Sequence, residues 1–151
     1  MTKALLLPAC LVLTATAVQA APAIMRTGAA TAPIAASVEV PAGSDVVYLS
    51  GMLPPVADPN APPGTPAAYG DTTTQTVNLF KHMQAVLAEK GLTLGDVVMM
   101  RIYMVGDPAK DGHMDFAGMM AGYKQFFGTP DQPNKPARST VQVAGLAAPG
   151  P

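Results

Sequence analysis

The segment from Asp71 to Lys90 constrains the fold most strongly, because it has the pattern of one amphipathic helix. Thr72 and Gln75 fit a capping box at its start, and Gly91 follows as a C-terminal capping residue. The apolar stripe repeats at helical spacing and comprises Thr76, Val77, Leu79, Phe80, Met83, Val86 and Leu87. Such a helix buries one face, so the rest of the chain must supply an apolar layer to cover it.

Alternating apolar residues predict strands on both sides of this helix. We expect strands over 33–41, 46–53 and 96–105 and from Arg138 onward, and a second helix over 111–127. The proline-rich stretch over 54–70 is expected to be a long loop. This order predicts an α+β fold of two layers, in which a mixed sheet carries both helices on one face.

Length and composition indicate a single domain without a nucleic-acid partner. The chain has 151 residues and a formal net charge of -1, so no basic excess is present to bind phosphates. Aromatic residues make up 5% and tryptophan is absent, so the core must depend on aliphatic residues and ten methionines.

The first twenty residues have the pattern of a secretory signal peptide, with Lys3 ahead of the apolar run 4–17. We expect cleavage between Ala20 and Ala21, a periplasmic or secreted product, and no membrane attachment after leader removal. The only cysteine, Cys10, would leave with the leader. A flexible arm over 21–32 and one domain over 33–151 are expected to follow.

The segment over 136–146 carries the leading candidate functional residue, Arg138, at the mouth of a predicted strand. Val141 and Val143 face one side of that strand, whereas Thr140 and Gln142 face the other. A guanidinium is planar, always charged, and can bind a carboxylate through two parallel hydrogen bonds. The alternative is a solvated surface charge or an ion pair at a subunit interface.

Two separated motifs, Val47-Tyr48-Leu49-Ser50-Gly51 and Ala137-Arg138-Ser139, resemble the signature of the Rid/YjgF family of imine deaminases. The resemblance runs from about Ile34 to Leu146 and includes Gly91-Leu92 and Tyr123 with Phe126-Phe127. It implies a chorismate-mutase-like fold, a homotrimer with sites in clefts between subunits, and neither metal nor organic cofactor.

The resemblance also implies an activity, the hydrolysis of small 2-imino acids and enamines to 2-keto acids and ammonia. Arg138 matches the family arginine that holds the substrate carboxylate, and is therefore the predicted catalytic residue. Ser50, Gly51 and Thr140 are the other predicted substrate-binding residues. The hydroxyl of Ser50 could instead belong to a strand-end turn, and Gly51 could mark a bulge.

Two departures from the family pattern keep other functions open. Ser37 falls near the place of a tyrosine that lines the family's cleft, and the chain ends before an expected final strand with a water-ordering glutamate. A trimeric module that binds small carboxylates without turnover, or one that acts as a holdase, is therefore the alternative. His82 and His113 lack neighbours at metal-ligand spacing, so no metal site is predicted.

Overall fold

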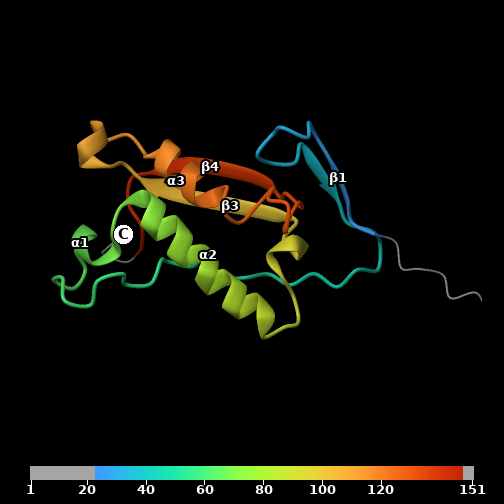
Figure 1. The fold of residues 1–151 in the computed structure, drawn as a ribbon, viewed down its shortest axis with the longest axis horizontal. Helices are drawn as coiled ribbons and strands as arrows, with labels where there is room; N and C mark the ends of the chain where they lie inside the picture. The colour runs from blue at the N-terminus through green and yellow to red at the C-terminus, as the bar shows by residue number, and fades with distance from the viewer. Residues whose placement is uncertain (1–22, 148–151) are drawn as a thin grey trace, which may run out of the picture.

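The computed structural model describes residues 23–147 and confirms the α+β class (Figure 1). The predicted leader over 1–20 and the last four residues lie outside the described part. The elements in chain order are β1 (Met25–Thr27), β2 (Ser37–Glu39), α1 (Pro66–Tyr69), α2 (Thr72–Ala88), η1 (Leu94–Asp96), β3 (Met99–Val105), η2 (Pro108–Lys110), α3 (Phe116–Tyr123) and β4 (Ala137–Val143). No helix within residues 23–147 combines the length and the apolar character that a membrane crossing requires.

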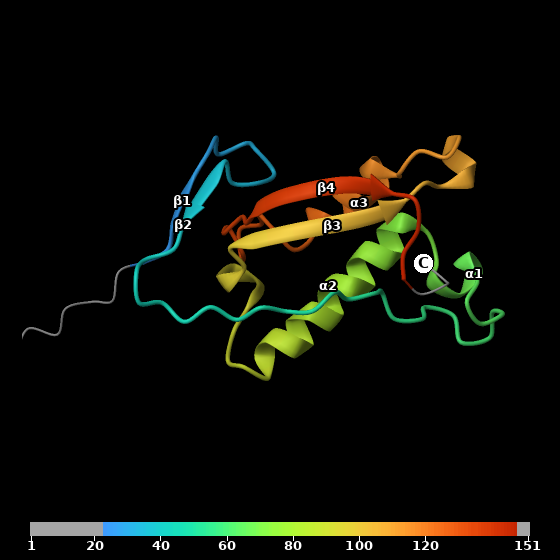
Figure 2. The same ribbon diagram turned by 180° about the vertical axis from the view of Figure 1, so that it is seen from behind.

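The strands form two ladders of opposite type. β3 and β4 run parallel, with Met100 opposite Arg138, whereas β1 and β2 form an antiparallel hairpin in which Met25 is opposite Glu39. Helices α2 and α3 lie on the same face of the β3–β4 ladder, which is seen from its two sides in Figures 1 and 2. Parallel strands need a crossover, and the long connection through η2 and α3 supplies it.

The N-cap of helix α2 lies one residue earlier than the predicted capping box places it. Asp71, rather than Thr72, is the N-cap, and its carboxylate accepts a hydrogen bond of 2.7 Å from the backbone N–H of Thr74. Gln75 reaches back, as a capping-box residue does, but its amide donates to the carbonyl of Gly70. At the other end Gly91 has a φ of +69°, a left-handed conformation that glycine adopts without strain.

The strand predicted over 46–53 is wrong, because this segment is extended but joins no ladder in the described structure. Figures 1 and 2 show it running past α2. Only Leu49 packs against the core, whereas Val46, Val47 and Tyr48 are exposed by 52%, 46% and 90%. β-propensity describes side chains that fit a pleated surface, and it does not supply the partner strand that a ladder needs.

Other boundaries also differ from the prediction: the stretch 54–70 that was expected to be a loop ends in the short helix α1, β3 begins only at Met99, and α3 ends already at Tyr123. Strand β1 lies within the stretch 21–32 that was expected to be a flexible arm, where Met25–Thr27 pair with β2. β2 is shorter than the predicted strand over 33–41. The second helix begins only at Phe116, because the side chain of Asp115 caps it by accepting from the N–H of Gly118 at 3.1 Å.

The core lies between the two helices and the β3–β4 ladder. Phe80 of α2 is 1% exposed, and its ring lies 6.0 Å from Tyr123, 5.4 Å from Phe126 and 5.3 Å from Phe127. The helices approach closely at Gly122, where an added Cβ would lie 2.7 Å from Cβ of Thr76. The hydroxyl of Thr73 also donates to the carbonyl of Gly118 at 3.0 Å. The α2–α3 pair therefore depends on small residues at its contact.

We predict that Phe80→Ala destabilises the protein by about 3–5 kcal/mol, because it removes a fully buried ring from the centre of the aromatic cluster. Urea unfolding followed by far-UV circular dichroism measures the loss. Tyr48→Ala is the control, since that side chain is 90% exposed and its removal should change the free energy of unfolding by less than about 0.5 kcal/mol. Equal losses for the two variants would contradict this description of the core.

Candidate carboxylate-binding site

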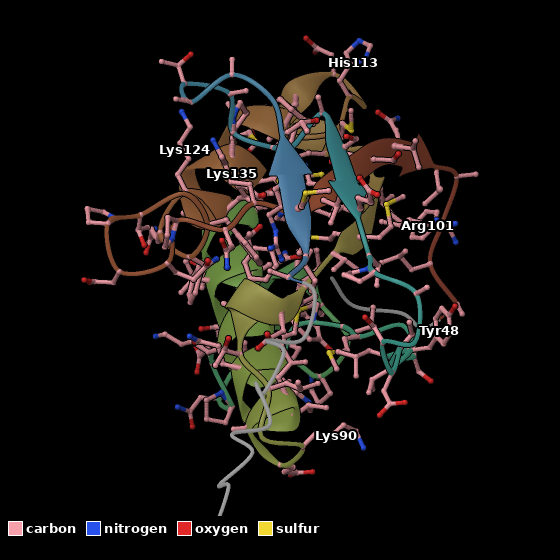
Figure 3. The ribbon with its side chains drawn as sticks, turned by 90° about the vertical axis from the view of Figure 1, so that its right-hand side faces the viewer. Tyr48, Lys90, Arg101, His113, Lys124 and Lys135 are labelled. Atoms are coloured by element: carbon pink, nitrogen blue, oxygen red, sulfur yellow. The ribbon has the colours of Figure 1, made fainter. Side chains whose placement is uncertain are left out.

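Arg138 lies near the start of β4 and faces the helices. Its register partner on β3, Met100, is 7% exposed and belongs to the core, and side chains of paired residues lie on the same face of a ladder. The side chain of Arg138 accordingly reaches α3 and is only partly exposed. Arg101, by contrast, is exposed on the opposite face of β3 (Figure 3).

The guanidinium of Arg138 is held by sulfur atoms and an aromatic ring. Its Nη2 lies 3.2 Å from the sulfur of Met120 and its Nη1 lies 4.0 Å from that of Met119. Its Cζ lies 4.3 Å from the ring centroid of Tyr123 and 6.0 Å from that of Phe116. Thioethers are weak acceptors, and a ring face attracts a cation without using its N–H groups. These contacts fix the position of the cation, and because a guanidinium has five N–H groups, those not directed at the two sulfurs remain available to a ligand.

No described carboxylate neutralises Arg138. The ion pair recorded within residues 23–147 joins Lys110 to Asp115 and does not involve Arg138. Burial lowers the pKa of Arg138, and the nearby Tyr123 opposes that effect. Arginine nevertheless stays protonated at neutral pH. The site is therefore a partly desolvated positive charge, to which an anion would bind more strongly than to an exposed one.

Two buried hydroxyl groups on this face have no hydrogen-bond partner among the described residues, Tyr123 Oη and Thr140 Oγ1. Burial raises the pKa of Tyr123 to about 12, against a smaller opposing effect of the charge on Arg138. The phenol is therefore protonated and can donate. Thr140 lies two residues beyond Arg138 on the same face of β4. Buried hydroxyls without partners are uncommon, and both would gain from a polar ligand or a water molecule.

A groove opens where the β1–β2 hairpin meets the first residues of β3 and β4. It has a volume of about 510 Å³ and is lined by the hairpin loop over 28–36 together with Met99, Ala137, Arg138 and Ser139. We call it the hairpin groove. Its volume lies in the range of roughly 300–1,000 Å³ typical of small-molecule sites. Arg138 is the only charged residue that lines it, so the groove suits a small, largely apolar anion.

The hairpin loop is fastened to the entry of β4, which gives the groove its shape. The N–H of Ala35 donates to the carbonyl of Pro136 at 3.1 Å. The ammonium of Lys135 donates to the carbonyls of Ala30 and Ala32 at 2.9 and 2.7 Å. These bonds connect parts of the chain that are about a hundred residues apart in sequence, so the groove exists only in the folded protein.

The other predicted site residues lie elsewhere. Ser50 and Gly51 are exposed and do not line the hairpin groove, and Thr140 lies on the face of Arg138 but outside the groove lining. Ser37, considered for the place of a cleft tyrosine, instead exchanges a hydrogen bond of 2.7 Å with the hydroxyl of Thr27. Ile34 occupies the groove wall.

Sequence reasoning missed the residues that hold the guanidinium. Met119, Met120 and Tyr123 share one face of the predicted helix over 111–127, but their spacing does not distinguish core residues from residues that hold a cation. The signal that could have identified them is the alternation in β4, which directs Arg138 toward the same helices. A charge directed at an apolar helix face needs contacts there that can hold it.

The chemistry available in the groove of one chain is binding and orientation. No cluster of three or more His, Cys, Asp or Glu side chains suited to a metal ion occurs within residues 23–147. No histidine or carboxylate lines the groove, so the described chain offers no general base there. A reaction that needs only a fixed substrate and an ordered water molecule would fit these groups.

We predict that Tyr123→Phe flattens the loss of stability at alkaline pH. Burial raises the pKa of Tyr123 from its ordinary value of 10.0 to about 12, so the unfolded chain loses this proton near pH 10 while the folded chain keeps it until about pH 12, and the folded state loses stability across that interval. At neutral pH the variant should be at least as stable, because the lost hydroxyl has no described partner.

Thermal unfolding at neutral pH and between pH 10 and 12 measures both effects. Tyr48→Phe controls for the loss of one phenol at an exposed position. If wild type and Tyr123→Phe lose stability with the same slope above pH 10, the assigned environment of Tyr123 is wrong.

Comparisons with known proteins agree with this architecture. The sequence model of the family described as Endoribonuclease L-PSP matches residues 27–150. The chain is 32% identical over 123 residues to a RutC family protein of Haemophilus influenzae, covering 82% of this chain and 85% of that protein. A 2-iminobutanoate/2-iminopropanoate deaminase of Salmonella typhimurium is 33% identical over 101 residues, which cover 67% of this chain and 69% of that protein. The chain therefore belongs to the Rid/YjgF family, the family described as Endoribonuclease L-PSP, and has its chorismate-mutase-like α+β fold.

Proposed function

We propose that the protein hydrolyses small 2-imino acids, and the enamines that tautomerise to them, to 2-keto acids and ammonia. Arg138 supports this proposal most directly, because its partly buried guanidinium has no carboxylate partner among the described residues and belongs to the wall of a groove. The deaminase of Salmonella typhimurium among the relatives supports the same reaction class.

The reaction needs little more than the groups described. The 2-imino acid would bind through its carboxylate to the two-pronged edge of the guanidinium, with its short side chain against the apolar groove wall. Water adds to the carbon of the C=N bond, the resulting carbinolamine breaks its C–N bond, and ammonia leaves while the carbonyl forms. Fixing the substrate beside an ordered water molecule lowers the barrier through orientation alone.

A second copy of the chain would complete the site. The face of β3 and β4 that points away from the helices exposes Met99, Tyr103, Val105 and Val141 by 49%, 54%, 37% and 44%. Apolar surface of this extent commonly marks an interface. Met99 also lines the hairpin groove, so a subunit packed on this face would lie beside the groove. We therefore propose a homotrimer with its sites at the subunit contacts, exported by the leader over 1–20.

Binding of a small carboxylate without turnover is the second candidate. The groove of one chain contains no histidine or carboxylate, and this observation favours a binding role over catalysis. Ligand-dependent thermal stabilisation without accelerated hydrolysis would identify that role.

We predict that Arg138→Ala lowers kcat/KM for imine hydrolysis about a hundredfold, which corresponds to about 3 kcal/mol for the loss of one partner of a buried charge pair. Imino acids generated with an amino-acid oxidase supply the substrate, and their disappearance is followed directly. Lys90→Ala is the control, because Lys90 is an exposed cation just beyond α2 that lines neither the hairpin groove nor the exposed face of β3 and β4.

The oligomeric state of both variants should equal that of the wild type by light scattering. Equal rates for wild type and Arg138→Ala would refute the proposed role of Arg138. An unaccelerated reaction with wild type, together with carboxylate binding that Arg138→Ala abolishes, would favour the binding role instead.

A further inference from the structure

We propose that a second hollow, separate from Arg138, binds a small oxyanion. It lies on the other side of the hairpin loop, between β1 and the segment that leads into β4, and has a volume of about 190 Å³. We call it the Lys135 pocket, and its walls include Arg26, Asn134 and Lys135, together with Thr27, whose hydroxyl is hydrogen-bonded to that of Ser37. This volume is below the roughly 300–1,000 Å³ of sites for drug-sized ligands, and suits a group such as phosphate or carboxylate.

The polar side chains of the Lys135 pocket are held in place by backbone carbonyls. Nη2 of Arg26 donates to the carbonyl of Gly95 at 2.8 Å, and the amide nitrogen of Asn134 donates to the same carbonyl at 3.3 Å. The ammonium of Lys135 donates to Ala30 and Ala32, which leaves its third N–H free of any recorded bond. Three donors therefore border one hollow in fixed positions.

The charge of the Lys135 pocket is not balanced. Two cations line it and no carboxylate does, and the ion pair recorded within residues 23–147 involves neither Arg26 nor Lys135. Nε of Arg26 is buried and has no hydrogen-bond partner among the described residues. Both side chains are partly buried, so they lose part of their hydration without gaining an opposite charge.

An oxyanion would resolve this imbalance. A phosphate or carboxylate group presents several acceptors to two cations, and such charge-assisted hydrogen bonds are about twice as strong as neutral ones. Desolvation of the pocket walls would strengthen the attraction relative to exposed surface charges. The apolar part of the wall is formed by the hairpin loop, which closes the hollow on the side of the hairpin groove.

The Lys135 pocket and the hairpin groove share the hairpin loop but not their charged residues. Gly28, Ala29, Ile34 and Ala35 line both, whereas Arg138 lines only the groove and Lys135 only the pocket. Lys135 fastens the loop, so an anion that bound to it would also act on the wall of the groove. The proposal stands independently of the imine chemistry.

Inorganic phosphate is the probe, titrated into the full chain at constant ionic strength and followed by backbone amide chemical shifts and calorimetry. Saturable shifts should occur at Ala30 and Asn134, which line the Lys135 pocket and not the hairpin groove. Arg26→Gln and Lys135→Gln should each weaken binding at least about tenfold, which is the loss of about 1.4 kcal/mol expected for one charge-assisted bond. Malonate as a second probe distinguishes a carboxylate site from a phosphate site.

Two control variants should bind phosphate like the wild type. Lys90→Gln removes a lysine at the far end of α2, well away from Lys135, which lies beside the hairpin (Figure 3). Arg138→Ala removes the cation of the groove, so retained binding separates this site from the proposed catalytic one. If the wild type shows no saturable shifts at Ala30 and Asn134 with either probe, or if Lys90→Gln weakens binding as much as Lys135→Gln, the proposal is wrong.

Discussion

The close contact between α2 and α3 is the constraint on which the described site depends. Thr76 occupies the space that a side chain at position 122 would need. Across the same contact, the hydroxyl of Thr73 donates a hydrogen bond to the backbone carbonyl of Gly118 in α3. This contact fixes the rotation of α3. The face of α3 beside β4 then consists of Phe116, Met119, Met120 and Tyr123, and the ring of Tyr123 stacks on Phe127 at 4.8 Å. A bulkier residue at 122 would separate the helices and move the ring that supports Arg138.

The surroundings of Arg138 explain how a charge can be partly buried and still be able to bind an anion. An acidic neighbour would neutralise the guanidinium and occupy the same donors that a substrate carboxylate needs. Sulfur and a ring face instead hold it by polarisability and quadrupole attraction, worth about 0.5–2 kcal/mol for a cation over a ring. Burial costs part of that, as the lowered pKa of Arg138 indicates. The charge of Arg138 thus stays uncompensated among the described residues, and a bound anion would supply the opposite charge.

Sequence patterns correctly predicted the elements with strong periodicity. They gave wrong predictions where pairing with another strand decides whether an element forms. The helix over 71–90 and the strands β3 and β4 follow from local patterns, and so does the side of β4 on which Arg138 lies. The segment over 46–53 has an equally clear strand pattern, yet it finds no ladder within the described chain. The short strand β1 has too few residues for any periodicity, and it forms only because β2 lies opposite. The hairpin groove depends on contacts across about a hundred residues, which no local pattern contains.

Lys135 and Arg138 are three residues apart in sequence and line hollows on opposite sides of the hairpin loop. Proline at 136 is fully buried between them, and its carbonyl accepts the hydrogen bond from Ala35 that joins the loop to β4. Proline has a fixed φ and no N–H to donate to a ladder, so the chain has little freedom between the Lys135 pocket and β4. A shift of the loop by an anion at Lys135 would therefore be transmitted to the groove wall at Ile34 and Ala35 rather than absorbed in the strand. The two hollows share Gly28, Ala29, Ile34 and Ala35 as walls, so the shape of each depends on how Lys135 and Pro136 hold the hairpin loop.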